Sequence, residues 1–416
     1  MRRVLLLLLF LTVFVLPAHA LPRYIFLFIG DGLGQEEIDL YKASVPQASF
    51  SAFPVHVLLG NLTADGRIPD SAASATSIAC GVKTKEGTLA QDASGRPAKS
   101  IAQEAKENGL RVGIITNVAL NDATPAAFYA HASSRRNYDE IAQQLIESGF
   151  DLFVGSGIAT STREKREEIL HHAQAKGYSI TRDFQEFTSF KGPLPLLALL
   201  PFTFAIDRKE TSPTLSQCVR KAIELLQGPR GFLLVIEGGR IDWCNHMNDI
   251  ASSLKELEEF DAAIWEALSF GKKHPEETLV LVTADHETGG LRLKRKPSPV
   301  ALRQKGSYER FFTELAAVPF EKETLRQFIS SFWEEESEIE EILANFLASK
   351  DEKTLWISLA RLFAEKAGIS WSTTGHAALL VPLYAWGEGA LLFAGATENT
   401  DIARILREEV VSERVF

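Results

Sequence analysis

Cysteine is scarce in this chain of 416 residues, which has only Cys80, Cys218 and Cys244. Three cysteines without the spacing of a thiolate metal site allow at most one disulfide and exclude a disulfide framework. Positive charge is also in deficit, because 44 lysines and arginines face 54 acidic residues, for a net charge of −10. That balance excludes a general basic surface, so we expect no nucleic-acid-specific binding.

Long hydrophobic runs are lacking too, except for residues 4–16, which are apolar apart from Thr12. Two arginines precede this run, and Ala18-His19-Ala20 follows it as an A-x-A cleavage site. The pattern predicts a signal peptide over residues 1–20, cleaved after Ala20, and therefore a secreted or periplasmic protein. We expect no stable membrane span in the mature chain of residues 21–416; a retained N-terminal anchor is the alternative.

Short apolar runs alternate with helical patterns along most of the chain. The runs that read as buried strands are residues 24–29, 111–116, 151–154, 232–236, 278–283 and 379–384. Helical patterns occupy residues 101–108, 163–176, 215–226, 254–268 and 399–409. This alternation predicts an α/β fold, a three-layer α/β/α sandwich with a mostly parallel central sheet.

Residues 291–369 interrupt the alternation. Apolar residues recur there at helical spacing, with acidic residues 334–336 between two such stretches. The pattern predicts amphipathic helices, which we interpret as a helical subdomain inserted into a single catalytic domain of residues 21–416. A lid over a site, formation of a homodimer and contact with a partner all remain open as its role.

A serine followed by small residues stands at positions 71–79, directly after Asp70. Ser71 lies where a helix would begin, and a helix N-terminus suits a bound phosphate. A serine hydroxyl is a poor nucleophile unless a neighbouring group activates it. The alternative is a plain N-cap on a tightly packed alanine-rich helix.

Acidic residues and histidines follow several of the predicted strands. Asp31, Glu237 and the pair Asp285-His286 stand at strand ends, and Asp242 and His246 are four residues apart, on one face of a helical turn. Ligands bind beyond the carboxyl ends of parallel strands, so these side chains would converge. Clustered carboxylates repel one another unless cations lie between them. Two metal ions about 4 Å apart would serve displacement at phosphorus and would activate Ser71.

The sequence resembles the alkaline phosphatase family in stretches that follow the family's order. They are G-D-G at 30–32, D-S-A-A-S-A-T at 70–76, D-A-T-P-A-A at 122–127 with His131 and Arg135, E-G-G-R-I-D at 237–242 with His246, T-A-D-H at 283–286 and T-G-H at 374–376. Residues 291–369 carry no family motif. Each stretch is modest alone, and together they are specific.

The resemblance implies two zinc ions and one magnesium ion. The residues that carry over as ligands are Asp242, His246 and His376 for one zinc; Asp285 and His286, with Asp31, for the other; and Asp31, Thr124 and Glu237 for magnesium. From the residues alone, a capped helix with a hydrogen-bonded histidine is as good an explanation of Asp242 and His246.

The resemblance also implies hydrolysis of phosphate monoesters to an alcohol and inorganic phosphate. Ser71 would form a phosphoserine, Arg135 would hold two phosphoryl oxygens, and Asp122 would contact magnesium through water. Asp122 could instead be a simple helix cap, and Arg135 a surface residue. The alternatives in function are a phosphodiesterase of the same superfamily and a non-catalytic protein that binds phosphate or metal.

Trp243 departs from the family pattern. Some bacterial members carry a lysine and some animal members a histidine at this position, where a basic residue would contact phosphate through water. A tryptophan cannot make that contact, so we expect an effect on phosphate release, metal affinity and pH optimum. Packing at the rim of the site is the alternative.

Overall fold

The computed structural model describes residues 22–295, 303–333 and 339–408. The predicted signal peptide and the acidic residues 334–336 lie outside these ranges. Within the described residues, no helix has both the length and the apolar character needed to cross a membrane. All three cysteines are buried and free, so the single disulfide that their number allows does not form.

A nine-stranded sheet runs through the described part of the chain, in the order β2-β13-β8-β1-β7-β3-β4-β6-β5. The strands from β8 to β5 are parallel, whereas β13 is antiparallel to both β8 and β2. Their bounds are β1 (Tyr24–Gly30), β2 (Val55–Leu59), β3 (Arg111–Thr116), β4 (Leu152–Gly155), β5 (Ser179–Thr181), β6 (Leu196–Leu199), β7 (Phe232–Gly238), β8 (Thr278–Ala284) and β13 (Val381–Gly387).

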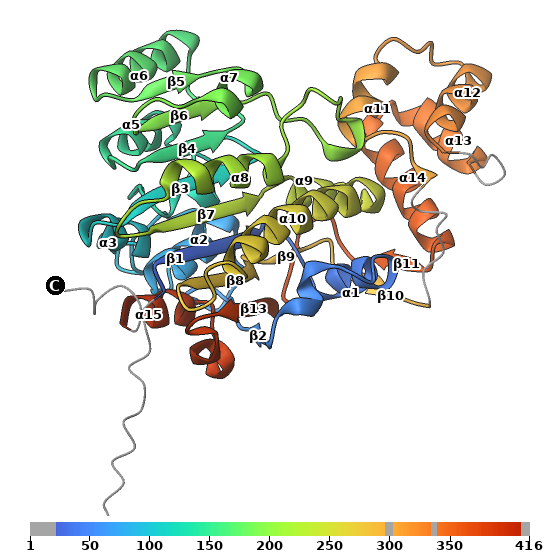
Figure 1. Ribbon diagram of the computed structural model, residues 1–416. Coiled ribbons are helices and arrows are strands. Elements are labelled where there is room, and N and C mark those ends of the chain that lie inside the picture. Colours follow the sequence, from blue (N-terminus) through green and yellow to red (C-terminus); the bar gives the residue numbers. More distant parts are fainter. Residues whose placement is uncertain (1–21, 296–302, 334–338, 409–416) are drawn as a thin grey trace, which may run out of the picture.

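Helices cover both faces of this sheet; α8 and α10 lie in front of it and α2 behind it in Figure 1. The predicted α/β/α sandwich with a mostly parallel sheet is confirmed. The helices of this body are α1 (Gln35–Ser44), α2 (Ser71–Cys80), α3 (Ile101–Glu107), α4 (Ala123–Ala126), α5 (Tyr138–Glu147), α6 (Arg163–Ala175), α7 (Phe184–Ser189), α8 (Leu215–Leu226), α9 (Arg240–His246), α10 (Ile250–Gly271) and α15 (Thr400–Leu406), with 3-10 turns η1 (Ser49–Ala52), η2 (Ala205–Asp207) and η4 (Ala390–Gly395).

Local sequence signals account for most of these boundaries. α3 begins with a capping box, in which Ser100 accepts from the backbone N–H of Gln103 and Gln103 accepts from that of Ser100. α8 has the predicted bounds. α10 begins four residues earlier than predicted because Asp249 caps it, accepting from the backbone N–H of Ser252.

Among the described residues, four helices project from one side of the body and form what we call the helical lobe, residues 308–333 and 339–366 (Figure 1). They are α11 (Tyr308–Leu315), α12 (Lys322–Phe332), α13 (Glu340–Ser349) and α14 (Glu352–Lys366). The lobe packs around its own hydrophobic cluster, which Met247 of the body joins. Strands β10 (Leu291–Leu293) and β11 (Ile369–Trp371) bracket it and pair antiparallel. The predicted helices are therefore present, and their description as an inserted subdomain stays a prediction.

Candidate active site

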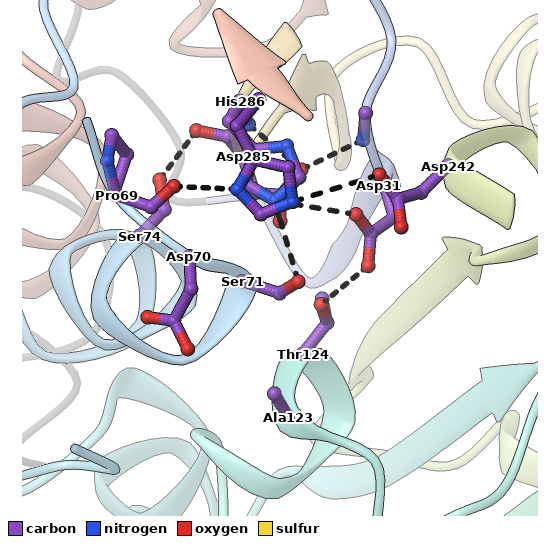
Figure 2. A network of polar contacts seen from close by, with 12 residues as sticks. Asp31, Pro69, Asp70, Ser71, Ser74, Ala123, Thr124, Asp242, Asp285 and His286 are labelled. Atoms are coloured by element: carbon purple, nitrogen blue, oxygen red, sulfur yellow. Dashed lines mark hydrogen bonds and ion pairs between the residues drawn. The ribbon is translucent and has the colours of Figure 1, made fainter. Parts of the chain in front are cut away.

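Ser71 is the first residue of α2, as predicted, and is buried. Asp70 caps the helix: its Oδ1 accepts from the backbone N–H groups of Ala73, at 3.1 Å, and of Gly87, at 3.0 Å. Alanine, serine and threonine side chains follow, and all of them up to Ser77 are buried. Because these side chains are small, neighbouring segments approach the start of α2 closely, as Figure 2 shows.

The carboxyl ends of three adjacent strands bring four of the predicted residues together. Gly30 of β1 is in register with Gly238 of β7 and with Ala284 of β8, so the chain leaves all three strands at one level. The four buried side chains at this edge are Asp31, Glu237, Asp285 and His286. The structure thus brings them to one edge, and Figure 2 shows three of them, Asp31, Asp285 and His286, together.

Asp242 links two histidines to this edge. It lies on α9 one turn before His246, and its Oδ2 is 3.3 Å from His246 Nε2. His376, from the short strand β12 (His376–Ala377), brings its Nε2 to 4.0 Å from Asp242 Oδ1. Ligand atoms of Asp242, His246 and His376 lie within 4.8 Å of one another, and so do those of Asp31, Asp242 and His286. Asp242 therefore belongs to both groups.

The ring orientations leave each Nε2 free to bind a cation. His246 Nδ1 lies 2.6 Å from the carbonyl of Thr374, and His376 Nδ1 lies 2.8 Å from that of Pro69. A carbonyl only accepts, so each Nδ1 carries a proton, and in the neutral ring the lone pair is on Nε2. Metal-bound histidines in proteins show this arrangement.

A hydroxyl group places the proton of His286 on Nδ1 as well. Thr288, in β9 (Glu287–Thr288), donates to Asp242 Oδ1 at 2.6 Å, which uses its single proton. Its oxygen can then only accept from His286 Nδ1, 3.2 Å away. Thr288 thus orients two candidate metal ligands, Asp242 and His286.

Without a cation, burial and mutual repulsion disfavour the charged forms of the carboxylates at this edge. Burial, and then the charges of Asp285 and Asp242, raise the pKa of Asp31 well above its ordinary value. Burial also raises the pKa of Asp285 to about 7. Oδ1 of Asp31 and Oδ2 of Asp285 are buried and have no hydrogen-bond partner among the described residues. A divalent cation would satisfy both oxygens, so the donor set fits a bound metal.

An oxygen-rich group lies beside these residues. Thr124, on α4, donates its hydroxyl to Asp31 Oδ2 at 3.3 Å. Burial and the charge of Asp122 raise the pKa of Glu237 to about 8, although hydrogen bonds from Thr116 and Thr124 lower it. Asp31, Thr124 and Glu237 would offer three oxygen ligands, which suit magnesium better than zinc.

Arg135 lies beside the serine. Its Nη1 is 3.4 Å from Ser71 Oγ and 3.2 Å from Asp70 Oδ2, and its Nη2 is 2.9 Å from Asp122 Oδ1. Burial lowers the pKa of Arg135, but the charges of Asp122 and Asp70 outweigh this and raise it. Arg135 is thus part of the site and not a surface residue. Asp122 is both the cap of α4 and a partner of Arg135.

Trp243 is half-buried and packs against Phe204 and against Arg240 of its own helix. Its ring centroid lies 6.4 Å from that of Phe204, and the guanidinium of Arg240 lies over the Trp243 ring, at 5.4 Å from the centroid. These contacts agree with packing at the rim. Its effect on phosphate release stays a prediction.

Several residues that orient the site were not predicted to do so. The sequence pattern indicates Asp70 only as a helix cap, and it carries no signal for the carbonyls of Pro69 and Thr374 or for the hydroxyl of Thr288. Backbone carbonyls carry no side-chain signal. The T-A-D-H stretch ends two residues before Thr288, whose role depends on a contact with distant Asp242.

The sheet is mostly parallel and covered by helices, and a serine, an arginine and clustered acids and histidines lie at its strand ends. This combination points to the class of metal-dependent hydrolases. The alkaline phosphatase family model matches residues 23–411, so the chain belongs to the alkaline phosphatase family. It is therefore an enzyme of this family, a hydrolase, as the sequence motifs predict.

Relatives match over most of their length. Alkaline phosphatase 4 of Bacillus subtilis is 31% identical over 410 residues, which cover 92% of this chain and 88% of that protein. The crystal structure of a cold-active alkaline phosphatase from a psychrophilic Shewanella sp. is similar, with 30% identity, a TM-score of 0.81 and coverage of 92% of this chain and 98% of that one. That of Thermus thermophilus alkaline phosphatase has 25% identity, a TM-score of 0.82 and coverage of 94% and 91%.

Proposed function

We propose that the chain hydrolyses phosphate monoesters to an alcohol and inorganic phosphate, with Ser71 as the nucleophile. One observation carries this proposal: Ser71 Oγ, at the start of α2, lies 3.3 Å from His286 Nε2 and 3.4 Å from Arg135 Nη1. The hydroxyl thus faces both a candidate metal ligand and a group that binds phosphoryl oxygens. Membership of the alkaline phosphatase family supports the same activity.

Arg135 is the group that would bind the phosphoryl oxygens. Asp70 and Asp122 hold one amino group each, so the guanidinium plane is fixed before substrate arrives. A guanidinium carries five N–H donors, and those not used on the two carboxylates remain for substrate. A fixed fork binds two oxygens with little loss of side-chain entropy.

The reaction we propose has two displacements at phosphorus. In the first, Ser71 Oγ bonds to phosphorus and the bond to the ester oxygen breaks, which releases the alcohol and leaves a phosphoserine. In the second, water attacks that phosphorus and the bond to Ser71 breaks, which releases inorganic phosphate. The N-terminus of α2 favours the negative charge of the phosphoryl group throughout.

The metal content we propose is two zinc ions and one magnesium ion. The residues that would hold them are Asp242, His246 and His376; Asp31, Asp285 and His286; and Asp31, Thr124 and Glu237. When bound, such cations neutralise charge on the transferring group and favour deprotonation of a hydroxyl or a water. The unpartnered oxygens of Asp31 and Asp285 support cations at this place.

Monoesters are favoured over diesters by the charge around Ser71. A monoester carries a second negative charge, which Arg135 and a cation at Thr124 and Glu237 would balance. A phosphodiesterase is the competing enzyme function, and a binding protein without turnover is the competing function of another class. The complete set of nucleophile, arginine and candidate ligands argues against the latter.

Hydrolysis of a chromogenic phosphate monoester by residues 21–416 tests the proposal. The assay is run at several alkaline pH values with zinc and magnesium, beside Ser71→Ala, a chelated sample and the matching diester. Activity that is lost on both chelation and Ser71→Ala supports the metal-plus-serine mechanism. Turnover of the diester alone would move the function to a phosphodiesterase, and bound phosphate without turnover would favour a binding protein.

Export of the chain is a further part of this proposal. The basic start, the apolar residues 4–16 and Ala18-His19-Ala20 support a signal peptide and a secreted or periplasmic enzyme. Mass spectrometry of the expressed full chain should find Leu21 at the N-terminus; a retained Met1 would indicate an anchor instead. A homodimer also stays a prediction, which light scattering of residues 21–416 tests.

A further inference from the structure

Asn248 joins three segments of the chain through one fully buried side chain. Its Nδ2 donates to the carbonyl of Asn245, at the end of α9, and to that of Thr373, both at 3.0 Å. Its Oδ1 accepts from Arg361 Nε, on α14 of the helical lobe, at 2.8 Å. Both donors and the acceptor of one carboxamide are therefore used on three different elements.

Two of these segments end in histidines of the site. Asn245 immediately precedes His246, and Thr373 lies three residues before His376. The same loop contacts the first histidine directly, because the Thr374 carbonyl accepts from His246 Nδ1 at 2.6 Å. A shift of this loop relative to α9 would therefore change the separation of His246 and His376.

The helical lobe holds the same turn at other points. Trp356 Nε1, also on α14, donates to the carbonyl of Met247 at 3.1 Å, and the Met247 side chain belongs to the lobe's hydrophobic cluster. Asp249 accepts from Gln304 Nε2 at 2.7 Å and from the backbone N–H of Tyr308 at 3.2 Å. Three consecutive residues after α9 thus contact the lobe or the segment that leads into it.

The backbone conformation at position 248 favours asparagine over most other residues. Its φ is +52°, in the left-handed region that asparagine tolerates better than most residues. Glycine would accept the same backbone but would lose all three hydrogen bonds. Aspartate would place carboxylate oxygens against the carbonyls of Asn245 and Thr373, with no donor for either.

We infer that Asn248 and Arg361 are positioning residues, which let the helical lobe fix the distance between His246 and His376. The inference rests on the proposed function in one respect, namely that these histidines bind zinc. It gives the lobe a role in shaping the metal centre from outside. It does not require the lobe to touch substrate.

Zinc affinity measured by competition with a chromogenic chelator tests the inference. We expect Asn248→Gly to weaken binding by roughly 10-fold, the low end of what loss of a group that orients ligands costs. Arg361→Ala should weaken it less, and Arg361→Lys, which keeps a donor, should restore it in part. Arg326→Ala is the matched control, because Arg326 also belongs to the lobe but pairs with Glu323 and Glu340 there, away from the turn at Asn248.

The spectrum of a bound metal ion separates a positioning role from a loss of stability. The absorption spectrum of the Co²⁺-loaded protein should change in Asn248→Gly and Arg361→Ala and stay unchanged in Arg326→Ala. Arg361 stands on the exposed side of α14, so its replacement leaves no buried cavity even if Asn248→Gly fails to fold. Unchanged zinc affinity and an unchanged spectrum in Arg361→Ala would overturn the inference.

Hydrogen exchange of the metal-free protein tests the inference even if the proposed function is wrong. If the unmodified chain binds no zinc, the proposed metal content is wrong, but the contacts of Asn248 can still be tested. We expect Arg361→Ala to speed exchange in residues 244–248 and 372–376 and to leave β1 unaffected. Equal exchange in these segments would overturn the inference independently of any metal.

Discussion

Arg135 and Asp122 form an ion pair at the edge of the site, with Nη2 2.9 Å from Oδ1. Asp70 holds the other amino group at 3.2 Å, so the guanidinium is fixed from two sides. Asp70 is also the cap of the helix that begins with Ser71. The orientation of the arginine is therefore tied to the start of the serine's own helix.

The first prediction concerns this fork. Arg135→Lys keeps a positive charge but loses the bidentate contact with two phosphoryl oxygens. Asp70 and Asp122 then compete for a single ammonium group. We expect kcat/KM for a phosphate monoester to fall roughly 10- to 100-fold, the value of one hydrogen bond to a charged group. Steady-state kinetics measure the effect. Kinetics equal to those of the unmodified enzyme would show that Arg135 does not bind the phosphoryl group.

The second prediction concerns metal removal and pH. Without cations, burial raises the pKa of Asp285 from 3.8 to about 7, so the folded chain binds a proton more tightly than the unfolded chain. The free energy of unfolding of the chelated protein therefore falls as pH rises through this window, and stays low above it. Bound cations replace the proton and remove this loss.

The gap in melting temperature between metal-loaded and chelated protein should therefore widen from pH 5 to pH 8. At roughly 1,000 times the Kd, a ligand adds about 4 kcal/mol to the free energy of unfolding. Scanning calorimetry at each pH measures the gap. A gap that is constant or narrows with pH would contradict a cation at Asp31 and Asp285.

The third prediction concerns Gly32, next to Asp31. Its φ is +73°, and a Cβ there would lie 2.8 Å from Asp242 Cα. Gly32→Ala should therefore destabilise the fold by more than the roughly 1–2 kcal/mol that a left-handed conformation costs a non-glycine residue. It should also weaken metal binding, because Asp242 must move.

Gly66→Ala is the matched control for this variant. Gly66 has nearly the same φ, +76°, and its Cβ would meet nothing within 4 Å. The difference in free energy of unfolding between the two variants measures the close packing against Asp242 alone. Equal losses in both would show that the site tolerates the added methyl group.

The sequence predicts the arrangement of the site wherever local and topological rules suffice. Asp31 and Asp285 could be placed together because buried parallel strands precede both, and parallel strands end at one edge. Asp242 and His246 could be placed on one face because they are a helical turn apart. Ser71 follows from the capping pattern of Asp70.

Contacts between distant segments could not be predicted in this way. His376 reaches the site through β12, which pairs antiparallel with β9 although the helical lobe lies between the two strands in the sequence. The role of Asn248 depends on Arg361, which is more than a hundred residues away. Nothing in the local pattern of either residue distinguishes it from a surface asparagine or arginine. Prolines interrupt the apolar residues 194–205 on either side of β6, so the local pattern predicts neither a strand nor a helix there.

Glu37 provides the basis of the last prediction. It lies on α1, fully buried behind α9, and accepts from Asn245 Nδ2 at 2.8 Å and from the hydroxyl of Ser253. Burial raises its pKa from 4.5 to about 7, although these two hydrogen bonds lower it. Asn245 also donates to the carbonyl of Gly32, at 3.2 Å. Through Asn245, a buried carboxylate therefore contacts both the helix that carries Asp242 and the turn that follows Asp31.

Glu37→Gln should change how stability depends on pH. In the unmodified chain the folded state binds the proton more tightly, so the free energy of unfolding falls by up to about 3 kcal/mol between pH 5 and pH 8 on account of this group. A glutamine can still accept from Asn245 and can donate to Ser253, and it does not titrate. We therefore expect the variant to gain stability relative to its parent as pH rises, with both saturated in metal. Denaturant unfolding at each pH measures the difference, with exposed Glu258→Gln as the control; parallel curves for Glu37→Gln and its parent would mean that Glu37 is charged, or neutral, throughout.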